Sequence, residues 1–118
     1  MRSNSVMMKT LLLRDKYCVH CGQTEYLVPH HRKNRGMGGS KLLDIFPNLM
    51  LVCAEYNFAM ESDWQIANQA RSWKHKLRST DHPSEPVFDN IAGAWFELKI
   101  DGTKREIENA IDQGRTLL

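Results

Sequence analysis

Long apolar segments are missing from this 118-residue sequence. No apolar run approaches the roughly 20 residues that a bilayer-spanning helix needs, so we expect no membrane partner. The apolar run from Met7 to Leu13 is broken by Lys9 and followed by Arg-Asp-Lys, which does not fit a secretory signal. Phosphate-binding loops of the P-loop or Rossmann type are also missing. These absences argue against membrane proteins and the common nucleotide-binding classes.

Cysteine is scarce, and the three cysteines cannot form an even-numbered disulfide framework. Together with the missing secretory pattern, this predicts an intracellular, cytoplasmic protein with reduced thiols. Two of them, Cys18 and Cys21, form a C-x2-C knuckle whose spacing lets two thiolates reach one tetrahedral ion. Cys53 offers a third thiolate, but Tyr56 stands where a fourth would be expected.

Three interpretations of these cysteines remain open. The first is a structural Zn²⁺ site of Cys18, Cys21 and Cys53, completed by His20, water or another group. The second is a vestigial site that packing alone holds together. The third is a redox dithiol, which is disfavoured because the sequence shows no βαβ setting of the thioredoxin kind.

The length and the 42% hydrophobic composition predict a single domain covering residues 1–118, which buries about two-thirds of its unfolded surface. The net charge of +2 is unevenly distributed: residues 1–53 carry 8 basic and 3 acidic side chains, and residues 54–118 carry 8 and 11. A basic first half suggests a polyanionic partner, because Lys and Arg favour approach to a phosphate backbone. An ordinary solvated face would give the same count.

Periodicity predicts most elements of the first two-thirds of the chain. We expect a helix over Ser5–Asp15, strands over Tyr26–His31 and Leu49–Cys53, and a helical segment over Ala54–Met60. The Gly-rich, basic stretch between the strands is too long for a tight hairpin, and loops of that length are usually functional. A capping-box pattern at Ser62-Asp-Trp-Gln65 predicts a second helix, whose apolar stripe consists of Ile66, Ala70, Trp73 and Leu77, with Trp64 as an addition.

The last third is more ambiguous. Val87–Asp89 and Trp95–Ile100 suggest a β-hairpin, and Asp101-Gly102 a turn. The segment after this turn fits either a strand over Thr103–Ile107 or a capped helix that begins at Thr103 and runs through Ala110 and Ile111 to Gly114; we favour the helix. In the polar stretches nearby, His75 and His82 are expected to be exposed.

The stretch from Leu27 to Glu61 combines residue types that suit metal-assisted attack on a phosphodiester. Such hydrolysis needs an activated water, a Lewis acid and stabilisation of the leaving oxygen. A histidine near its usual pKa of about 6.5 can be the base. Adjacent residues of a strand point to opposite sides, so His30 and His31 are better suited to distinct roles than to a ligand pair.

Several motifs occur in the order of a strand-loop-strand-helix unit: RDKYCVHCG, LVPHHRKNRGMGGSK, PNLMLVC and YNFAMESD. This series resembles the HNH endonucleases, the ββα-metal nucleases, over roughly Arg14 to Leu77, and most of all small HNH proteins of actinobacterial bacteriophages. The resemblance implies an α+β fold with a ββα-metal core over about 14–77, flanking helices, and a C-terminal hairpin and helix extension over about 86–118. It also implies a DNA endonuclease of low sequence specificity, acting in the host cytoplasm if phage-encoded, with a phage or host protein as a possible partner.

By this resemblance, His31 is the general base and Asn48 the central Asn that holds the loop and orients the base. His30 is a metal ligand, and Asn57 stands at the final histidine of the motif, which makes this an HNN sequence. Glu61 lies one helical turn later, where some members place another ligand. This oxygen-rich set favours Mg²⁺ or Mn²⁺ over zinc at the catalytic site.

The basic side chains after the histidine pair are expected to contact DNA phosphates without reading sequence, and they are Arg32, Lys33, Arg35 and Lys41. A solvated loop is the alternative. The two departures from the family pattern, at Tyr56 and Asn57, leave room for a catalytically impaired HNH scaffold that binds DNA or a protein. A weaker third hypothesis is a structural zinc protein without a nucleic-acid role.

Overall fold

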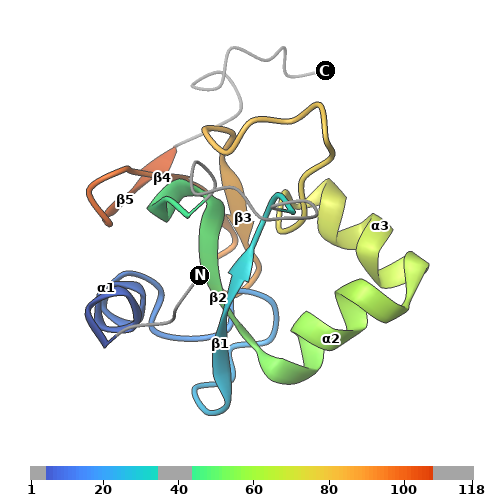
Figure 1. The fold of residues 1–118 in the computed structure, drawn as a ribbon, viewed down its shortest axis with the longest axis horizontal. Coiled ribbons are helices and arrows are strands. Elements are labelled where there is room, and N and C mark those ends of the chain that lie inside the picture. Colours follow the sequence, from blue (N-terminus) through green and yellow to red (C-terminus); the bar gives the residue numbers. More distant parts are fainter. Residues whose placement is uncertain (1–4, 35–43, 108–118) are drawn as a thin grey trace.

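Two small antiparallel sheets and three helices form an α+β fold in the computed structural model, which describes residues 5–34 and 44–107 (Figure 1). The α+β class predicted from the sequence is therefore confirmed. In chain order the elements are α1 (Ser5–Asp15), β1 (Leu27–His31), the 3-10 turn η2 (Phe46–Asn48), β2 (Leu49–Cys53), α2 (Ala54–Ser62), α3 (Trp64–Ser72), β3 (Val87–Asp89), β4 (Ala94–Leu98) and β5 (Lys104–Ile107).

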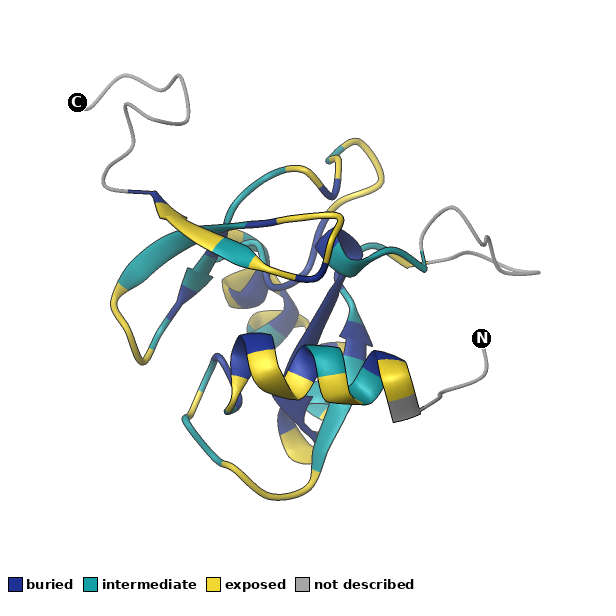
Figure 2. Cartoon of the chain, turned by 90° about the vertical axis from the view of Figure 1, so that its left-hand side faces the viewer, coloured by how far each residue is buried: buried dark blue, intermediate teal, exposed yellow. Residues whose placement is uncertain are grey.

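The first sheet pairs β1 with β2 and lies between two layers of helix. All five residues of β2 are buried, and their side chains alternate between the layers. Leu49 and Leu51 join a cluster with Met7 and Leu11 of α1, whereas Met50 and its neighbours on the other face join the larger core beside α2. Figure 2 shows buried ribbon, in dark blue, at the centre of the molecule. Because both faces of β2 are covered, its sequence is continuously apolar instead of alternating.

Two helices follow β2 with almost no interruption. The first, α2, begins directly after Cys53, whose sulfur accepts a hydrogen bond from the amide of Tyr56. The next helix, α3, begins after Asp63, whose carboxylate accepts from the amides of Gln65 and Ile66. The predicted cap at Ser62 is therefore wrong by one residue, because Ser62 still belongs to α2.

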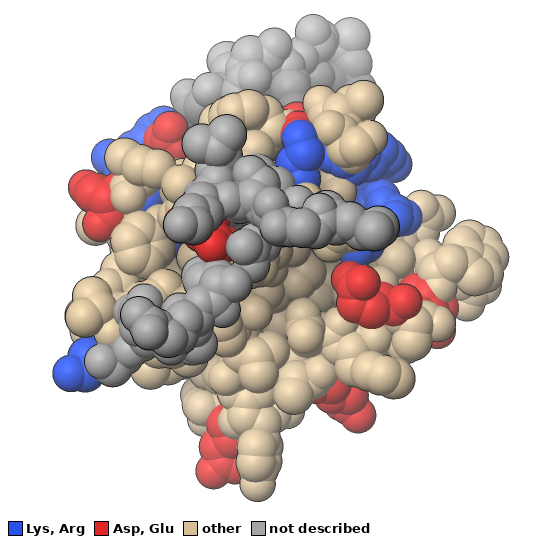
Figure 3. Space-filling model, viewed as in Figure 1, with Lys and Arg blue, Asp and Glu red and all other residues tan. Residues whose placement is uncertain are grey.

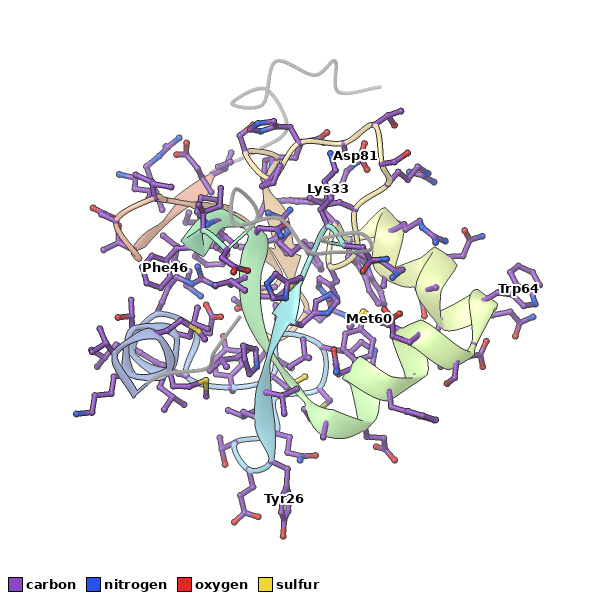
Figure 4. The ribbon with its side chains drawn as sticks, in the orientation of Figure 1. Tyr26, Lys33, Phe46, Met60, Trp64 and Asp81 are labelled. Atoms are coloured by element: carbon purple, nitrogen blue, oxygen red, sulfur yellow. The ribbon has the colours of Figure 1, made fainter. Side chains whose placement is uncertain are left out.

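The apolar stripe of α3 is shorter than predicted. Ala70 is buried, but the helix ends at Ser72, so buried Leu77 lies beyond it, and Trp64 is 73% exposed. Trp64 therefore adds nothing to the core, and it projects from the corner between the two helices (Figure 4). None of the helices in the described ranges has the length and apolarity that crossing a bilayer demands.

The second sheet has the order β3-β4-β5. The helix favoured after Thr103 is wrong as far as Ile107, since Lys104–Ile107 forms β5 and pairs with β4; the rest of that predicted helix lies outside the described residues. Ile107 faces inward and Arg105 outward, where it pairs with Glu97. Gly102 in the β4–β5 turn has φ +90° and lies against α1, where a Cβ would stand 2.6 Å from Thr10 Cγ2.

Candidate functional site

The candidate site lies where the end of β1 meets α2. The register pairs His30 with Met50 and His31 with Leu49, and the strand alternation sends the two adjacent rings to opposite sides. His30 is buried on the side of α2, whereas the side chain of His31 is 22% exposed. The two histidines therefore have different surroundings and different partners.

Both ring nitrogens of His30 have partners. Nε2 lies 2.9 Å from the carbonyl oxygen of His75, and because a carbonyl only accepts, Nε2 carries the proton. The lone pair is therefore on Nδ1, which faces Asn57 Oδ1 at 3.2 Å. Burial lowers the pKa of His30 to about 4, so the ring is neutral near pH 7, as a metal ligand must be.

The facing atoms of His30 and Asn57 suit a shared cation. Two atoms that both present lone pairs repel each other unless a cation lies between them or the amide turns its NH₂ group inward. Neighbouring ligands of an octahedral ion with bond lengths of about 2.1 Å stand roughly 3.0 Å apart, close to the 3.2 Å between these atoms. A hydrogen bond from the turned amide group to His30 Nδ1 has the same length.

Glu61 follows Asn57 by one turn of α2, but its carboxylate already has a cationic partner. Glu61 Oε2 lies 3.0 Å from Lys76 Nζ, and the lysine side chain is 10% exposed against 55% for the glutamate. After burial, the charge of Lys76 is a further cause of the low pKa of His30, whereas the bond to the His75 carbonyl and the charge of Glu61 act in the opposite direction. Lys76 thus belongs to the same site, although no sequence pattern identified it.

His31 is held by an acidic residue that the sequence reading missed. Its Nε2 lies 2.8 Å from Asp44 Oδ1, and both side chains are partly exposed. A carboxylate on one ring nitrogen fixes the tautomer with the proton on that nitrogen, which leaves Nδ1 with a lone pair. Asp44 therefore prepares His31 to accept a proton at Nδ1.

Asn48 closes the polypeptide around the end of β1. It is fully buried, its Oδ1 accepts from the amide of Lys33 at 2.8 Å, and its Nδ2 donates to the carbonyl of Lys33 at 3.0 Å. Its own carbonyl accepts from the amide of Arg32 at 2.7 Å. These bonds fix the two residues after His31, so Asn48 acts on the position of that ring through the backbone.

Arg32 is buried and does not lie on the surface, where a contact with DNA phosphates was predicted. It is 1% exposed, and its guanidinium donates to five backbone carbonyls: those of Lys74, Pro47, Pro83, Glu85 and Pro86. Burial lowers its pKa to about 9, which still leaves it charged at pH 7. Arg32 therefore joins β1 to the segment before β3 and presents no donor to a DNA phosphate.

The other basic residues of the expected DNA surface have mixed outcomes. Lys33 is partly buried, and its Nζ donates to the carbonyl of Asp81 at 3.0 Å, next to which it lies in Figure 4. Arg35 and Lys41 lie outside the described residues. Figure 3 shows Lys and Arg side chains grouped beside a cluster of acidic ones on this face, so the surface is mixed in charge.

The three cysteines meet at one point. The sulfurs of Cys18, Cys21 and Cys53 lie within 4.8 Å of one another, and those of Cys21 and Cys53 are 3.9 Å apart. Thiolates on a tetrahedral zinc ion with Zn–S bonds of about 2.3 Å stand roughly 3.8 Å apart. The three sulfurs therefore could hold a metal such as zinc, and among the described residues no His nitrogen or carboxylate completes this group.

Tyr56 does not serve as the fourth ligand. Its hydroxyl lies 2.7 Å from His75 Nδ1, while His75 Nε2 donates to the carbonyl of Phe88 at 2.7 Å. His20 stacks on the Tyr56 ring with 3.9 Å between centroids. His75 is fully buried, so the expectation that it is exposed is wrong. The carbonyl of His75 also accepts from His30, so Tyr56 and His75 together connect the cysteine cluster to the candidate site.

Comparison of the chain with models of protein families, with curated proteins and with solved structures finds no match in any of the three.

Proposed function

We propose that the protein is a divalent-metal-dependent DNA endonuclease of the HNH type. The observation that carries the proposal is the arrangement at the end of β1. One histidine is held neutral with its lone pair toward an amide oxygen of α2, and the next is held by a carboxylate on the other side of the strand. A metal-dependent nuclease needs these two roles, a metal ligand and a base.

His31 is the general base in this proposal. Asp44 keeps the proton on Nε2, so Nδ1 takes a proton from water as that water attacks the phosphorus atom. Asn48 holds the residues that follow His31 and thereby limits the movement of its ring. Asp44 and Asn48 thus fix the tautomer of the ring and the backbone that follows His31.

His30, Asn57 and Glu61 would hold the divalent ion, Mg²⁺ or Mn²⁺. When bound, this ion would supply Lewis-acid stabilisation of the charge on the phosphate and on the leaving 3′ oxygen. The burial of His30 keeps its ring neutral, and the bond to the carbonyl of His75 fixes its orientation. Separately, the three cysteines would hold structural Zn²⁺, whose fourth ligand comes from water or another group.

Plasmid cleavage tests this proposal. Supercoiled plasmid incubated with the protein and Mn²⁺ or Mg²⁺ should become open or linear, and His31→Ala should abolish the conversion. His82→Ala is the matched control, because His82 is an exposed histidine whose ring contacts only nearby Ser84 among the bonds observed. Purified protein that leaves the plasmid intact across several divalent metals would refute the endonuclease proposal.

A second candidate function is a catalytically impaired HNH scaffold that binds DNA or a protein. The ion pair between Lys76 and Glu61 favours it, because a lysine beside the donor set opposes a divalent ion. Retardation of a DNA duplex that persists in excess chelator, without cleavage in any metal, would support this candidate. Lys33→Met should then weaken the binding and reduce its salt dependence.

A further inference from the structure

Lys76 directs its charge at one of the candidate metal ligands. Its backbone follows His75, whose carbonyl holds His30, and its Nζ lies 3.0 Å from Glu61 Oε2. The lysine stem is largely buried, so the ammonium cannot move far from this place without exposing apolar surface. The glutamate is the accessible partner, because more than half of its side chain is exposed.

The ion pair between Lys76 and Glu61 contributes little to the stability of the fold. A pair with one partner 55% exposed gains little net free energy, because water already solvates the carboxylate well. Its larger effect is on the charge of the site. With Lys76 in place, the net charge offered to a cation by this lysine and Glu61 is close to zero instead of −1.

We propose that Lys76 is an internal competitor for the divalent ion: its ammonium occupies the Glu61 carboxylate, which a metal ion must take over in order to bind. This inference rests on the proposed site at His30, Asn57 and Glu61, but not on cleavage activity. It predicts that the protein binds Mn²⁺ weakly by itself, because the ion meets both a like charge and an occupied ligand.

The groove next to the ion pair has room for an anionic group of a bound substrate, which would be a second partner for the ammonium. A groove of about 420 Å³ lies beside Lys76 and Glu61, and Arg71 and acidic Asp63 also line it. A phosphate in this groove would attract both cations. Lys76 would then exchange a carboxylate for a phosphate oxygen while the carboxylate turns to the metal, so binding of the polyanion and of the metal ion would favour each other.

Mn²⁺ titration followed by electron paramagnetic resonance measures free ion directly and needs no cleavage. We expect Lys76→Met to bind Mn²⁺ about tenfold or more tightly than the unaltered protein, since a like charge near a divalent ion is removed. Lys74→Met is the matched control: it removes the same charge two residues away, from a lysine that pairs with Asp81 and Glu85 instead. Its affinity for Mn²⁺ should change less than about twofold.

Two further variants keep the test decisive. Lys76→Gln removes the charge but keeps a polar head and should reproduce the gain if Lys76→Met fails to fold. Adding Glu61→Gln to either variant should abolish the gain. Equal affinities in the Lys76 and Lys74 variants, or no Mn²⁺ binding by any of them, would overturn the inference. Tighter binding without plasmid cleavage would refute the endonuclease proposal alone.

Discussion

Replacing Arg32 by Lys should remove a large part of the free energy of unfolding of this domain, although the substitution keeps the positive charge. The guanidinium donates to five carbonyls at distances from 2.8 to 3.2 Å, and an ammonium has only three donors. At least two of these carbonyls, which are buried or partly buried, therefore lose their partner. A phosphate-contacting arginine on the surface would tolerate this change.

The expected loss follows from the cost of an unsatisfied buried acceptor. Two such carbonyls, at roughly 1–3 kcal/mol each, give a destabilisation of about 4 kcal/mol. With an m-value of about 1.5 kcal/mol/M, the urea midpoint should fall by roughly 2–3 M. This is a large part of the total for a domain of this size, for which 5–15 kcal/mol is typical.

Urea unfolding followed by tryptophan fluorescence measures this loss. Arg105→Lys is the control, because Arg105 is 53% exposed in a surface pair with Glu97. The free energy of unfolding of this variant should change by less than about 0.5 kcal/mol. An unchanged midpoint for Arg32→Lys, combined with weaker DNA binding, would refute the structural role and restore the phosphate contact expected from the sequence.

Two further predictions concern protons and metal. Burial lowers the pKa of His30 to about 4 and that of His75 to about 3, below the value of about 6.5 for an unfolded histidine. Below pH 6.5 the unfolded chain therefore binds more protons than the folded chain. The free energy of unfolding is at its full value above that pH and falls by about 4 kcal/mol from pH 7 to pH 5. A urea midpoint that stays constant over this range, measured in chelator, would contradict the burial of His30 and His75 as neutral rings. Zinc at 100 times its dissociation constant should raise stability by about 2.7 kcal/mol, with release of protons because burial raises the pKa of the Cys53 thiol to about 11. Cys21→Ser should lose this gain, and equal stability with and without zinc would rule out a site at the three sulfurs.

Local periodicity predicted the elements whose signal is local. The helix over Ser5–Asp15 and the strand over Leu49–Cys53 have the predicted bounds. The continuous apolar run of the strand matches its burial on both faces, whereas the helix leaves Leu13 exposed and buries Arg14. The prediction for the segment after Thr103 was wrong because the structure of this segment depends on a partner distant in sequence. A capping-box pattern favoured a helix, but pairing with β4 decided the outcome, and that partner is a tertiary contact.

The candidate site shows the same division. Order and spacing singled out His30, His31, Asn48 and Asn57, which the fold brings to one end of β1. Asp44 and His75 carried no local mark, because their roles come from partners distant in sequence. A lone histidine in a polar stretch is expected to be exposed. His75 is buried because the hydroxyl of Tyr56 and the carbonyl of Phe88, both distant in sequence, form hydrogen bonds with its ring.

The contact of Gly102 with Thr10 bears on how the chain folds as it is made. It places the turn of the last described hairpin against the first helix, so ends that are synthesised far apart in time become neighbours. Until that hairpin has been made, β2 can meet α1 and β1 but the larger core lacks Leu98 and its neighbours. Contacts of such long sequence separation are costly in entropy and form late. A nascent chain that pauses before this hairpin would therefore display unfinished apolar surface, and we expect it to be a substrate for chaperones and proteases until the last strands arrive.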